Sequence, residues 1–561
     1  HLVASQFQSS LLYALVDYMI GKRTCNGLWL ALGVWPLAMG CDSVSDQMDY
    51  CAEVDTMAAQ CLLPPPVEAD GLIYEIYLRS FYDTDGDGIG DLEGVVQKLD
   101  HLEMLGVGTI WLTPIFDSPS VAGYDPSDLG SIDADYGEIE DLERLATACE
   151  ERGIRLMVDI PINHTSREHP WFQVAESQKA SIYRDFYIFG DSQFDEYRWF
   201  ESSAGDWYYA YFGEALPDLD WFSPSLAGQM RSLMEGWVDH GLGGYRLDAV
   251  AQLIEEDGDI AYTESGHCLS GWMYGHMKGV DPNFVMLSEA WHDDPEIQLT
   301  YLGTESKPET DWLLDMPRQM RFRDSFQMGE LREDLPFLLL AHDKSGISGR
   351  MAPYLGNHDL RRFATRIEDE RIRRAWMVNH LLLPGAPVLY YGEEIDLEDS
   401  TENMGQDFGH RGPMQWNSGL NAGFTEGVPW YSIDTSYLDG VNVADQLEDP
   451  DSMLSLIVAL ADLRRQSRAL ESHGLTFRKV VSNKGWVVER DSDDDRVILV
   501  QNFSPDRLHL ELEANLGPGM IELTAESMPH EGLVITLEPY EYRVFGTVSL
   551  ADFVIPSQVV Y

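Results

Sequence analysis

The sequence predicts an α/β fold in which a (β/α)8 TIM barrel is the central domain. Helix and strand patterns alternate from the apolar run LIYEIYLRSF to about residue 446. Four short apolar runs within this region each end in charged residues. In a barrel of this kind, polar groups at the carboxyl ends of several strands lie around one mouth. The pattern therefore predicts a functional site at that mouth.

Further segments flank and interrupt the predicted barrel. A stretch rich in Trp, Tyr and Phe interrupts the alternation after the third strand, and short alternating strands (WVVER, RVILVQNF, YEYRVFG) follow the barrel and predict an antiparallel β-sandwich. The expected segments are an export signal at 1–41, an acidic linker at 42–68, the barrel at 69–160 and 223–465, an inserted lid domain at 161–222 and the C-terminal β-sandwich at 466–561.

The amino-terminal region has the pattern of a secretory signal. Lys22 and Arg23 precede an apolar run at 28–39, which is followed by Gly40 and Cys41. A run of this length is too short to span a bilayer, which takes about 20 residues. We therefore expect an exported protein without a membrane span, either secreted, periplasmic or anchored by a lipid on Cys41.

The remaining cysteines fit an oxidising compartment. Cys51 and Cys61 lie close enough in the sequence to close a small disulfide loop before the barrel. Cys149 lies in the helical pattern EDLERLATACEERG and is expected to be a buried apolar residue. No zinc-binding spacing of Cys and His is present in the sequence.

The charge balance excludes several classes of partner. The chain has 95 acidic and 38 basic residues, which give a formal net charge of −57. Such a surface repels nucleic acid and anionic membranes, so neither is an expected partner. The charge fits a saline habitat, where salt screens self-repulsion, and a neutral sugar substrate does not require it.

A monomer is the expected oligomeric state.

The four segments at the strand ends contain the candidate catalytic residues. They read VDIPINH, GYRLDAV, MLSEAW and YLGNHD, and each apolar run is typical of a buried parallel strand. Their polar residues combine three carboxylates with one arginine and two histidines: Asp248, Glu289, Asp359, Arg246, His164 and His358. This set suits the cleavage of a glycosidic bond and needs no organic cofactor.

The spacing of these residues suggests their roles. Retaining glycosidases use a nucleophilic carboxylate and an acid about 5–5.5 Å apart. Arg246 and Asp248 are two residues apart on a strand and share a face, so the guanidinium favours an ionised nucleophile. Glu289 ends an apolar run, and an apolar setting favours the protonated acid. Asp359 is placed to bind sugar hydroxyls as the ring flattens.

The segments resemble the conserved regions of the α-amylase family, glycoside hydrolase family thirteen. The family patterns are DxxxNH, GxRxDA, a Glu that ends the fifth strand, and NHD, and the resemblance spans roughly residues 71–545. It implies that Asp248 is the nucleophile, Glu289 the acid/base and Asp359 the stabiliser of the transition state. It also implies that substrate contacts come from Tyr124, Asp125, His164, Arg246, His358, Arg362 and Arg411.

A second motif predicts a structural Ca²⁺ site. The segment DTDGDGIGD places acidic residues at alternate positions with glycines between them, as in the first half of an EF-hand loop. It resembles the calcium loop of the oligo-1,6-glucosidase branch, which implies the ligands Asp83, Asp85, Asp87, Asp91 and the backbone carbonyl of Ile89. The alternative is an acidic surface turn. No second calcium site is expected at the junction of barrel and lid.

The substrate is less closely defined. LPDLDW lies between the signatures of the oligo-1,6-glucosidase and neopullulanase branches, so the chain resembles an intermediate member. In exo-acting relatives Asp125 would pair with Arg411 and close the non-reducing end of the pocket.

The expected function is retaining hydrolysis of α-1,4-glucosidic bonds in starch or maltooligosaccharides. The first alternative is an exo-acting α-glucosidase. A transglycosylase or isomerase of the same family, such as a glucanotransferase or trehalose synthase, is a further alternative, because it forms the same covalent intermediate. A non-catalytic sugar-binding or partner subunit, like the transporter heavy chains of the same superfamily, belongs to a different class.

Overall fold

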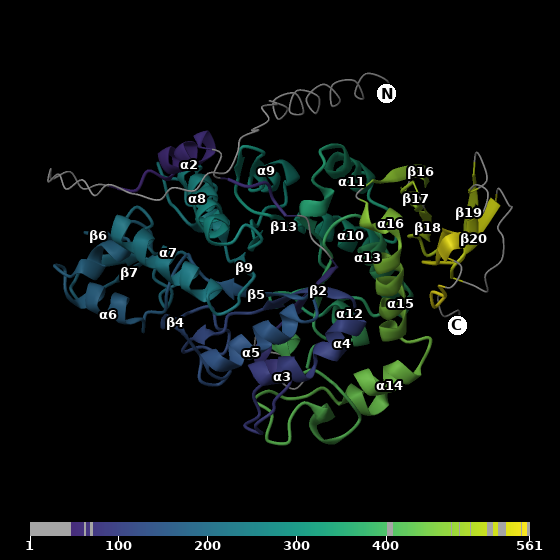
Figure 1. The fold of residues 1–561 in the computed structure, drawn as a ribbon, viewed down its shortest axis with the longest axis horizontal. Coiled ribbons are helices and arrows are strands. Elements are labelled where there is room, and N and C mark those ends of the chain that lie inside the picture. Colours follow the sequence, from purple (N-terminus) through teal and green to yellow (C-terminus); the bar gives the residue numbers. More distant parts are fainter. Residues whose placement is uncertain are drawn as a thin grey trace.

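The structure of the chain is a computed structural model (Figure 1). It describes residues 47–60, 63–67, 71–400, 408–472, 474–481, 483–493, 495–512, 516, 520–524, 534–550 and 553–557. The expected export signal and Cys41 lie outside these residues. Among the described residues, no helix combines the length and the apolar character that crossing a bilayer requires.

Eight parallel strands form the predicted barrel, and their order around it follows the sequence. A parallel bridge between Tyr354 and Val388 closes the sheet, because it links the segment after the seventh strand to the eighth. The YLGNHD segment thus contributes a single bridge rather than a full strand. The strands are β1 (Leu72–Ile76), β2 (Val107–Leu112), β5 (Arg155–Ile160), β9 (Gly244–Leu247), β10 (Val285–Ser288), β13 (Trp312–Leu314), β14 (Met351–Ala352) and β15 (Val388–Tyr390).

Alternation along these strands separates an apolar layer inside the barrel from a charged layer. Ile73, Met157 and Leu287 belong to one buried cluster that fills the interior. Asp159 lies two residues beyond Met157 on β5 and is in register with Arg246 on β9. Side chains two apart on a strand share a face, so the charged residues lie directly above the apolar layer. The sequence thereby positions charge at the carboxyl ends of the strands.

Helices surround the barrel, and several of them begin at a residue whose side chain caps a free N–H group. Ser223 caps α7 and Thr263 caps α8, and in both the side-chain oxygen accepts a backbone N–H of the first turn. The α-helices that follow the barrel strands, together with the shorter helices beside them, are α3 (Leu92–Gln97), α4 (Leu99–Met104), α5 (Ile139–Glu150), α7 (Pro224–Val238), α8 (Glu264–Val280), α9 (Pro295–Thr300), α10 (Met316–Met328), α11 (Leu335–Lys344), α12 (Phe363–Arg366), α13 (Glu370–Leu382), α14 (Val443–Glu448), α15 (Met453–Gln466) and α16 (Arg468–Glu471).

The aromatic stretch between β5 and α7 forms a small unit at the left of Figure 1. Its three strands pair in the order β6-β8-β7, and Tyr208 packs edge-on against Phe172 of its helix. Its elements are α6 (Pro170–Ser177), β6 (Phe189–Gly190), β7 (Trp199–Glu201) and β8 (Trp207–Tyr209). A ribbon of β3 (Phe116–Asp117) and β4 (Asp128–Ile132) precedes it, and the short hairpin β11 (Gly303–Thr304) and β12 (Lys307–Pro308) follows β10.

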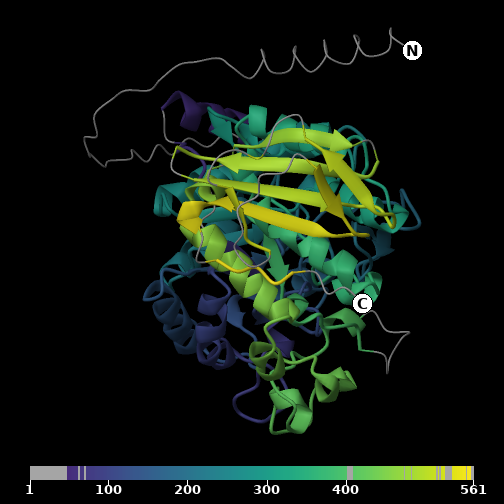
Figure 2. The same cartoon turned by 90° about the vertical axis from the view of Figure 1, so that its right-hand side faces the viewer.

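The C-terminal β domain is confirmed. A five-stranded sheet has the order β16-β17-β18-β22-β20, and β19 pairs with β21 in a second sheet (Figure 2). Val487 and Ile498 of the first sheet share a buried cluster with Leu510 and Ile535 of the second. The strands are β16 (Thr476–Val481), β17 (Gly485–Asp491), β18 (Arg496–Asn502), β19 (Leu508–Glu511), β20 (Met520–Glu522), β21 (Val534–Leu537) and β22 (Tyr542–Thr547).

The segment expected to be a linker contains a helix that is fixed to the barrel. Helix α2 (Tyr50–Ala59) packs on α8, where Cys51 forms a disulfide with Cys268. The predicted Cys51–Cys61 pairing is therefore wrong, because the true partner lies 217 residues away in the sequence. Cys149 is buried in α5, as predicted.

Candidate active site

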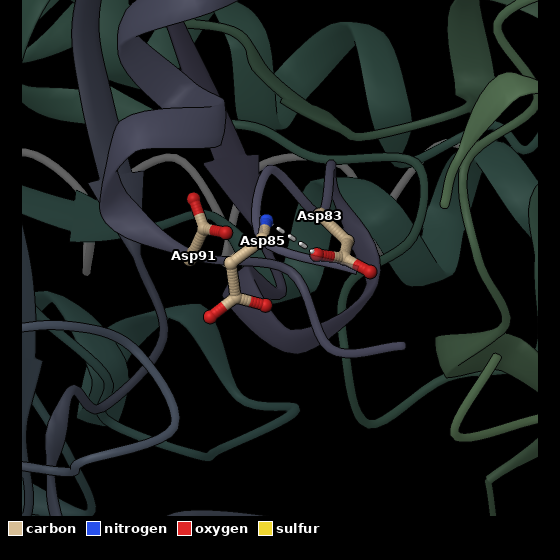
Figure 3. A group of neighbouring side chains, drawn as sticks. All are labelled: Asp83, Asp85 and Asp91. Carbon is tan, nitrogen blue, oxygen red and sulfur yellow. Dashed lines mark hydrogen bonds between the residues drawn. The ribbon is translucent and has the colours of Figure 1, made fainter. Parts of the chain in front are cut away.

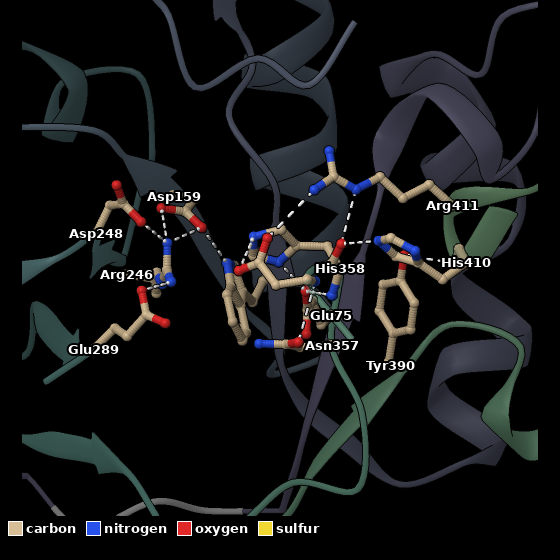
Figure 4. A network of polar contacts seen from close by, with 12 residues as sticks. Glu75, Asp159, Arg246, Asp248, Glu289, Asn357, His358, Tyr390, His410 and Arg411 are labelled. Atoms are coloured by element: carbon tan, nitrogen blue, oxygen red, sulfur yellow. Dashed lines mark hydrogen bonds and ion pairs between the residues drawn. The ribbon is translucent and has the colours of Figure 1, made fainter. Parts of the chain in front are cut away.

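Arg246 is the centre of a charged network inside the mouth of the barrel (Figure 4). Its Nη1 donates to Asp159 at 2.8 and 2.9 Å and to Asp248 at 2.7 Å, and its Nη2 donates to Glu289. The Arg246 side chain is fully buried. The two terminal nitrogens of one guanidinium thus hold Asp248 and Glu289 side by side, as the two-residue spacing on β9 and the strand-end position of Glu289 predict.

The surroundings of Glu289 favour its protonated form. Burial raises the pKa of Glu289 to about 7, and the negative charges of Asp248 and Asp359 act in the same direction. Arg246 opposes this shift but does not cancel it. A carboxyl group with this pKa holds a proton near neutral pH and can give it away.

His358 lies between two carboxylates and is an imidazolium. Its Nδ1 contacts Glu75 at 2.6 Å, and its Nε2 contacts Asp359 at 3.2 Å. Burial alone would lower the pKa of His358, but Asp359 and Glu75 raise it to about 10. In turn, burial would raise the pKa of Asp359, yet His358, Arg246 and Arg411 hold it below its usual range. Asp359 is therefore an anion with a fixed orientation.

Glu75 is a member of the site that sequence reasoning missed. It is fully buried on β1 and also accepts the backbone N–H of His358. The signal that could have found it is the single carboxylate, Glu75, within the otherwise apolar strand segment LIYEI. A charged residue in a buried strand needs a partner.

Tyr124 connects the part of the network around Arg246 with the part around His358. Its hydroxyl donates to Asp159 at 2.7 Å, and its ring stacks on His358 with the centroids 5.0 Å apart. His164 contacts the backbone carbonyl of Tyr124 through Nε2 at 2.9 Å. The structure therefore brings together Tyr124, His164, Arg246 and His358, as predicted.

Arg411 reaches the same network, and its partners differ from the one it would have in an exo-acting relative. Its Nε donates to the His358 carbonyl at 2.8 Å, and its Nη2 lies 3.3 Å from Asp359. Asp125 instead accepts hydrogen bonds from the hydroxyls of Ser118 and Ser120. The Asp125–Arg411 pair of the exo-acting alternative is therefore not formed, because other partners hold each side chain.

Arg362 is not brought to the mouth. It is 1% exposed, and its guanidinium donates to the carbonyls of Tyr391 at 2.7 Å and Gly412 at 3.3 Å. Its backbone N–H is held by Asp399. These contacts join loops beneath the mouth. Arg362 therefore has a structural role and does not make the predicted contact with the substrate.

The acidic loop after β1 gathers three of its four carboxylates (Figure 3). Oxygens of Asp83, Asp85 and Asp91 all lie within 4.8 Å of one another. Asp87 is outside this group, and its carboxylate accepts the backbone N–H of Ile89. Three clustered carboxylates fit a hard divalent cation.

A close approach of backbones fixes the shape of this loop. Gly88 has φ +96°, and a Cβ there would lie 1.8 Å from the Val428 carbonyl oxygen. Only glycine fits at that position. Thr425 also donates to Asp83, so the acidic loop is docked on the segment around Val428.

Two further carboxyl groups, the buried Asp218 and the half-buried Glu255, lie at the junction of the barrel and the aromatic unit. Burial raises the pKa of Asp218 well above its usual value, and it raises the pKa of Glu255 to about 7. Asp218 Oδ2 and Glu255 Oε1 have no hydrogen-bond partner among the described residues. Both shifts favour the protonated carboxyl. Sequence reasoning did not single out this pair.

A barrel whose mouth holds this network defines a glycosidase. Residues 75–473 match the family described as "Alpha amylase, catalytic domain". The chain is 31% identical to the oligo-1,6-glucosidase of Halalkalibacterium halodurans, with 85% of this chain and 98% of that one covered. It is 28% identical to alpha-amylase 3 of Dictyoglomus thermophilum, with 78% and 86% covered. The crystal structure of the alpha-amylase from H. orenii superposes with a TM-score of 0.75 at 28% identity, covering 86% of this chain and 100% of that one. The chain therefore belongs to the α-amylase family.

Proposed function

We propose that this glycosidase hydrolyses α-1,4-glucosidic bonds in maltooligosaccharides or starch with retention of configuration. The observation that carries the proposal is the shared guanidinium of Arg246, which holds Asp248 beside Glu289. Adjacent carboxyl groups suit a covalent glycosyl-enzyme route, because a wider gap is needed to place water between them.

In this mechanism Asp248 attacks the anomeric carbon while Glu289 gives its proton to the departing oxygen. The bond to the leaving sugar breaks as the bond to Asp248 forms. Water then loses a proton to the Glu289 carboxylate and displaces Asp248, which restores both groups. The anionic Asp359, which the imidazolium of His358 holds in place, binds hydroxyls of the same sugar more tightly as its ring flattens. The raised pKa of Glu289 supports its role as the acid.

Two observations support the α-1,4 linkage and an open cleft. The relative from Dictyoglomus thermophilum and the crystal structure from H. orenii are both called alpha-amylase. In addition, Arg411 lies towards Asp359, so the Asp125–Arg411 pair that would close the non-reducing end in an exo-acting enzyme is not formed. Substrates that extend past this point can then be accommodated.

The second candidate is an enzyme for α-1,6 bonds or for isomerisation. The relative from Halalkalibacterium halodurans is named an oligo-1,6-glucosidase, and the palatinase of Erwinia rhapontici is also 31% identical, with 84% of this chain and 97% of that one covered. Solved structures with 25% identity include a trehalulose synthase at a TM-score of 0.73. The name oligo-1,6-glucosidase favours short α-1,6-linked substrates.

We further propose that Asp83, Asp85 and Asp91 hold a structural Ca²⁺. The ion would supply positive charge to three carboxylates that otherwise repel one another, and it would keep the loop docked on the Val428 segment. We also propose that the protein is exported, and the Cys51–Cys268 disulfide supports this, because disulfides persist in oxidising compartments.

A product time course tests the proposed function. Maltoheptaose and isomaltotriose are incubated in parallel with the enzyme in Ca²⁺ and moderate salt, and chain lengths are resolved by chromatography. Early mid-length products from maltoheptaose support the α-1,4 endo-acting proposal. Glucose as the first product indicates an exo-acting glucosidase, faster cleavage of isomaltotriose favours the second candidate, and products longer than the substrate indicate transfer. No turnover by folded protein would support a binding subunit.

A further inference from the structure

Gly356, which begins the turn that carries Asp359, has no free space for a side chain. The turn spans residues 356–359 and follows β14. A Cβ on Gly356 would lie 2.8 Å from Oε1 of Glu393 and 3.5 Å from Nη2 of Arg366. The φ of Gly356 is outside the left-handed region. Glycine therefore serves a close approach here and not an unusual backbone conformation.

Glu393 and Arg366 occupy the space in which a side chain of residue 356 would lie. Arg366 is the last residue of α12, and Glu393 begins a short 3-10 helix after β15. Nη2 of Arg366 donates to the carbonyl of Leu355, and Oε2 of Glu393 accepts the backbone N–H of Tyr390 at 3.1 Å. We call these two side chains the turn clamp, because they join the base of the turn to the neighbouring part of the barrel.

The carboxyl group of Glu393 contacts the turn with an oxygen that has no other task. Its Oε1 is buried and has no hydrogen-bond partner among the described residues, and the residue is 3% exposed. Burial raises the pKa of Glu393 to about 8, and the charge of Glu75 acts in the same direction, while Arg366 opposes the shift. The group is therefore a neutral carboxyl near neutral pH, which is less costly to bury than an anion.

Other contacts orient the far end of the same turn. Glu75 accepts the backbone N–H of His358 at 3.1 Å, and Nε of Arg411 donates to the His358 carbonyl at 2.8 Å. These contacts set the direction in which His358 and Asp359 point. The turn clamp holds the base from which both side chains project.

We propose that Glu393 is a positioning residue that sets the place of Asp359 by packing on Gly356. The inference rests on the proposed function, in which Asp359 binds the sugar more tightly in the transition state than in the ground state. A misplacement of about 1 Å in an active site can lower the rate about 100-fold. An interaction made only in the transition state lowers kcat when it is lost and leaves KM unchanged. Loss of Glu393 is expected to have this effect.

Steady-state kinetics with α-glucosyl fluoride test this inference, because a donor without a second sugar does not depend on the α-1,4 assignment. In Glu393→Ala we expect kcat to fall about tenfold or more, with little change in KM. Glu393→Gln should retain most of kcat, because the amide keeps the size and the neutral charge of the protonated carboxyl. If Glu393→Ala does not fold, Glu393→Asp takes its place, because the shorter side chain withdraws the carboxyl from Gly356.

Glu394→Ala is the matched control for a purely structural effect. Glu394 is buried in the same 3-10 helix, but it contacts the hydroxyl of Tyr74, the imidazole of His101 and the backbone N–H of Gly392. Its removal should lower Tm and leave kcat unchanged.

A double-mutant cycle tests the contact between Glu393 and Gly356 itself. Gly356→Ala places a methyl group against the carboxyl, so it should lower both Tm and kcat. When Glu393→Ala is added, the methyl group occupies space that the carboxyl has left. The combined loss should therefore be smaller than the sum of the two single losses, as for residues in contact.

Wild-type kcat in Glu393→Ala, an equal loss of kcat in Glu394→Ala, or additive losses in the cycle would overturn the positioning role and leave the glycosidase intact. If the wild type released no fluoride, the proposed function would fail. In that event the Tm values of the cycle still decide whether Glu393 sets the place of Gly356: coupled losses support it, and additive losses reject it. Circular dichroism verifies that each variant is folded.

Discussion

The guanidinium of Arg246 is paired with the carboxyl group of Glu289 inside the barrel, and this pairing does not make Glu289 a permanent anion. Burial raises the pKa of Glu289 to about 7 even though Arg246 acts in the opposite direction. Here the free-energy cost of removing the carboxylate charge from water is larger than the stabilisation that one neighbouring cation provides. The arrangement therefore orients Glu289 through Arg246 and still leaves it able to carry a proton.

The pH dependence of kcat/KM follows from this balance. Glu289 must be protonated to act as the acid, so activity on maltooligosaccharides is expected to fall as the pH rises through about 7. α-Glucosyl fluoride needs little assistance to leave, so its cleavage is expected to depend less on pH in this range. A pH series with both substrates measures the difference, and equal alkaline losses for the two would contradict the role of Glu289.

Replacing Glu75 is expected to act through His358. Glu75→Gln removes one of the two carboxylates that raise the pKa of His358. A raised folded-state pKa contributes stability that is complete below the usual value of 6.5 and is lost as the pH rises towards about 10. The free energy of unfolding of the wild type should therefore decline across this window.

In Glu75→Gln this decline should begin at the same pH, near 6.5, but it should end at a lower pH and be smaller in total, because the folded-state pKa of His358 falls. Urea unfolding at several pH values, followed by circular dichroism, measures it. Parallel curves for the two proteins, separated by a constant offset, would show that Glu75 does not act through the charge of His358.

Calcium removal is expected to lower Tm by a few degrees. An ion that binds only the folded state stabilises it by about 2.7 kcal/mol at a hundredfold excess over Kd. Calorimetry with and without a chelator measures the shift for the wild type and for Asp85→Asn, which removes an exposed carboxylate of the group. The variant should respond less to the chelator. A wild-type Tm that does not depend on Ca²⁺ would reject the site.

The disulfide is expected to fix helix α2 to the barrel. Cys268→Ser frees Cys51, and removal of such a cross-link typically costs about 2–4 kcal/mol. Limited proteolysis should then cleave within or beside α2 sooner than in the wild type, with little change in kcat/KM. If α2 is cleaved at the same rate in both proteins, its packing on α8 alone secures it.

Local periodicity explains what the sequence could predict. The apolar runs before Asp159, Asp248 and Glu289 mark barrel strands, and the alternation of faces places these carboxyl groups at one mouth. The two-residue spacing of Arg246 and Asp248 predicts their contact, because the strand geometry fixes it.

Contacts between distant segments were not predictable in this way. Glu75 meets His358 across 283 residues, and Cys51 meets Cys268 across 217. Arg362 and Arg411 lie in segments without regular periodicity, so the sequence does not define where their side chains point. Only the closed barrel decides which carboxylate or carbonyl each one reaches.

The most direct test of the central claim is to trap the covalent intermediate. Glu289→Gln lacks the base that activates water, so with α-glucosyl fluoride it should form the glucosyl-enzyme and hydrolyse it slowly. Rapid acid quenching, mass spectrometry and peptide mapping would then locate the sugar. The account predicts one glucosyl unit on Asp248. A sugar on another residue, or fluoride release without any adduct, would contradict it.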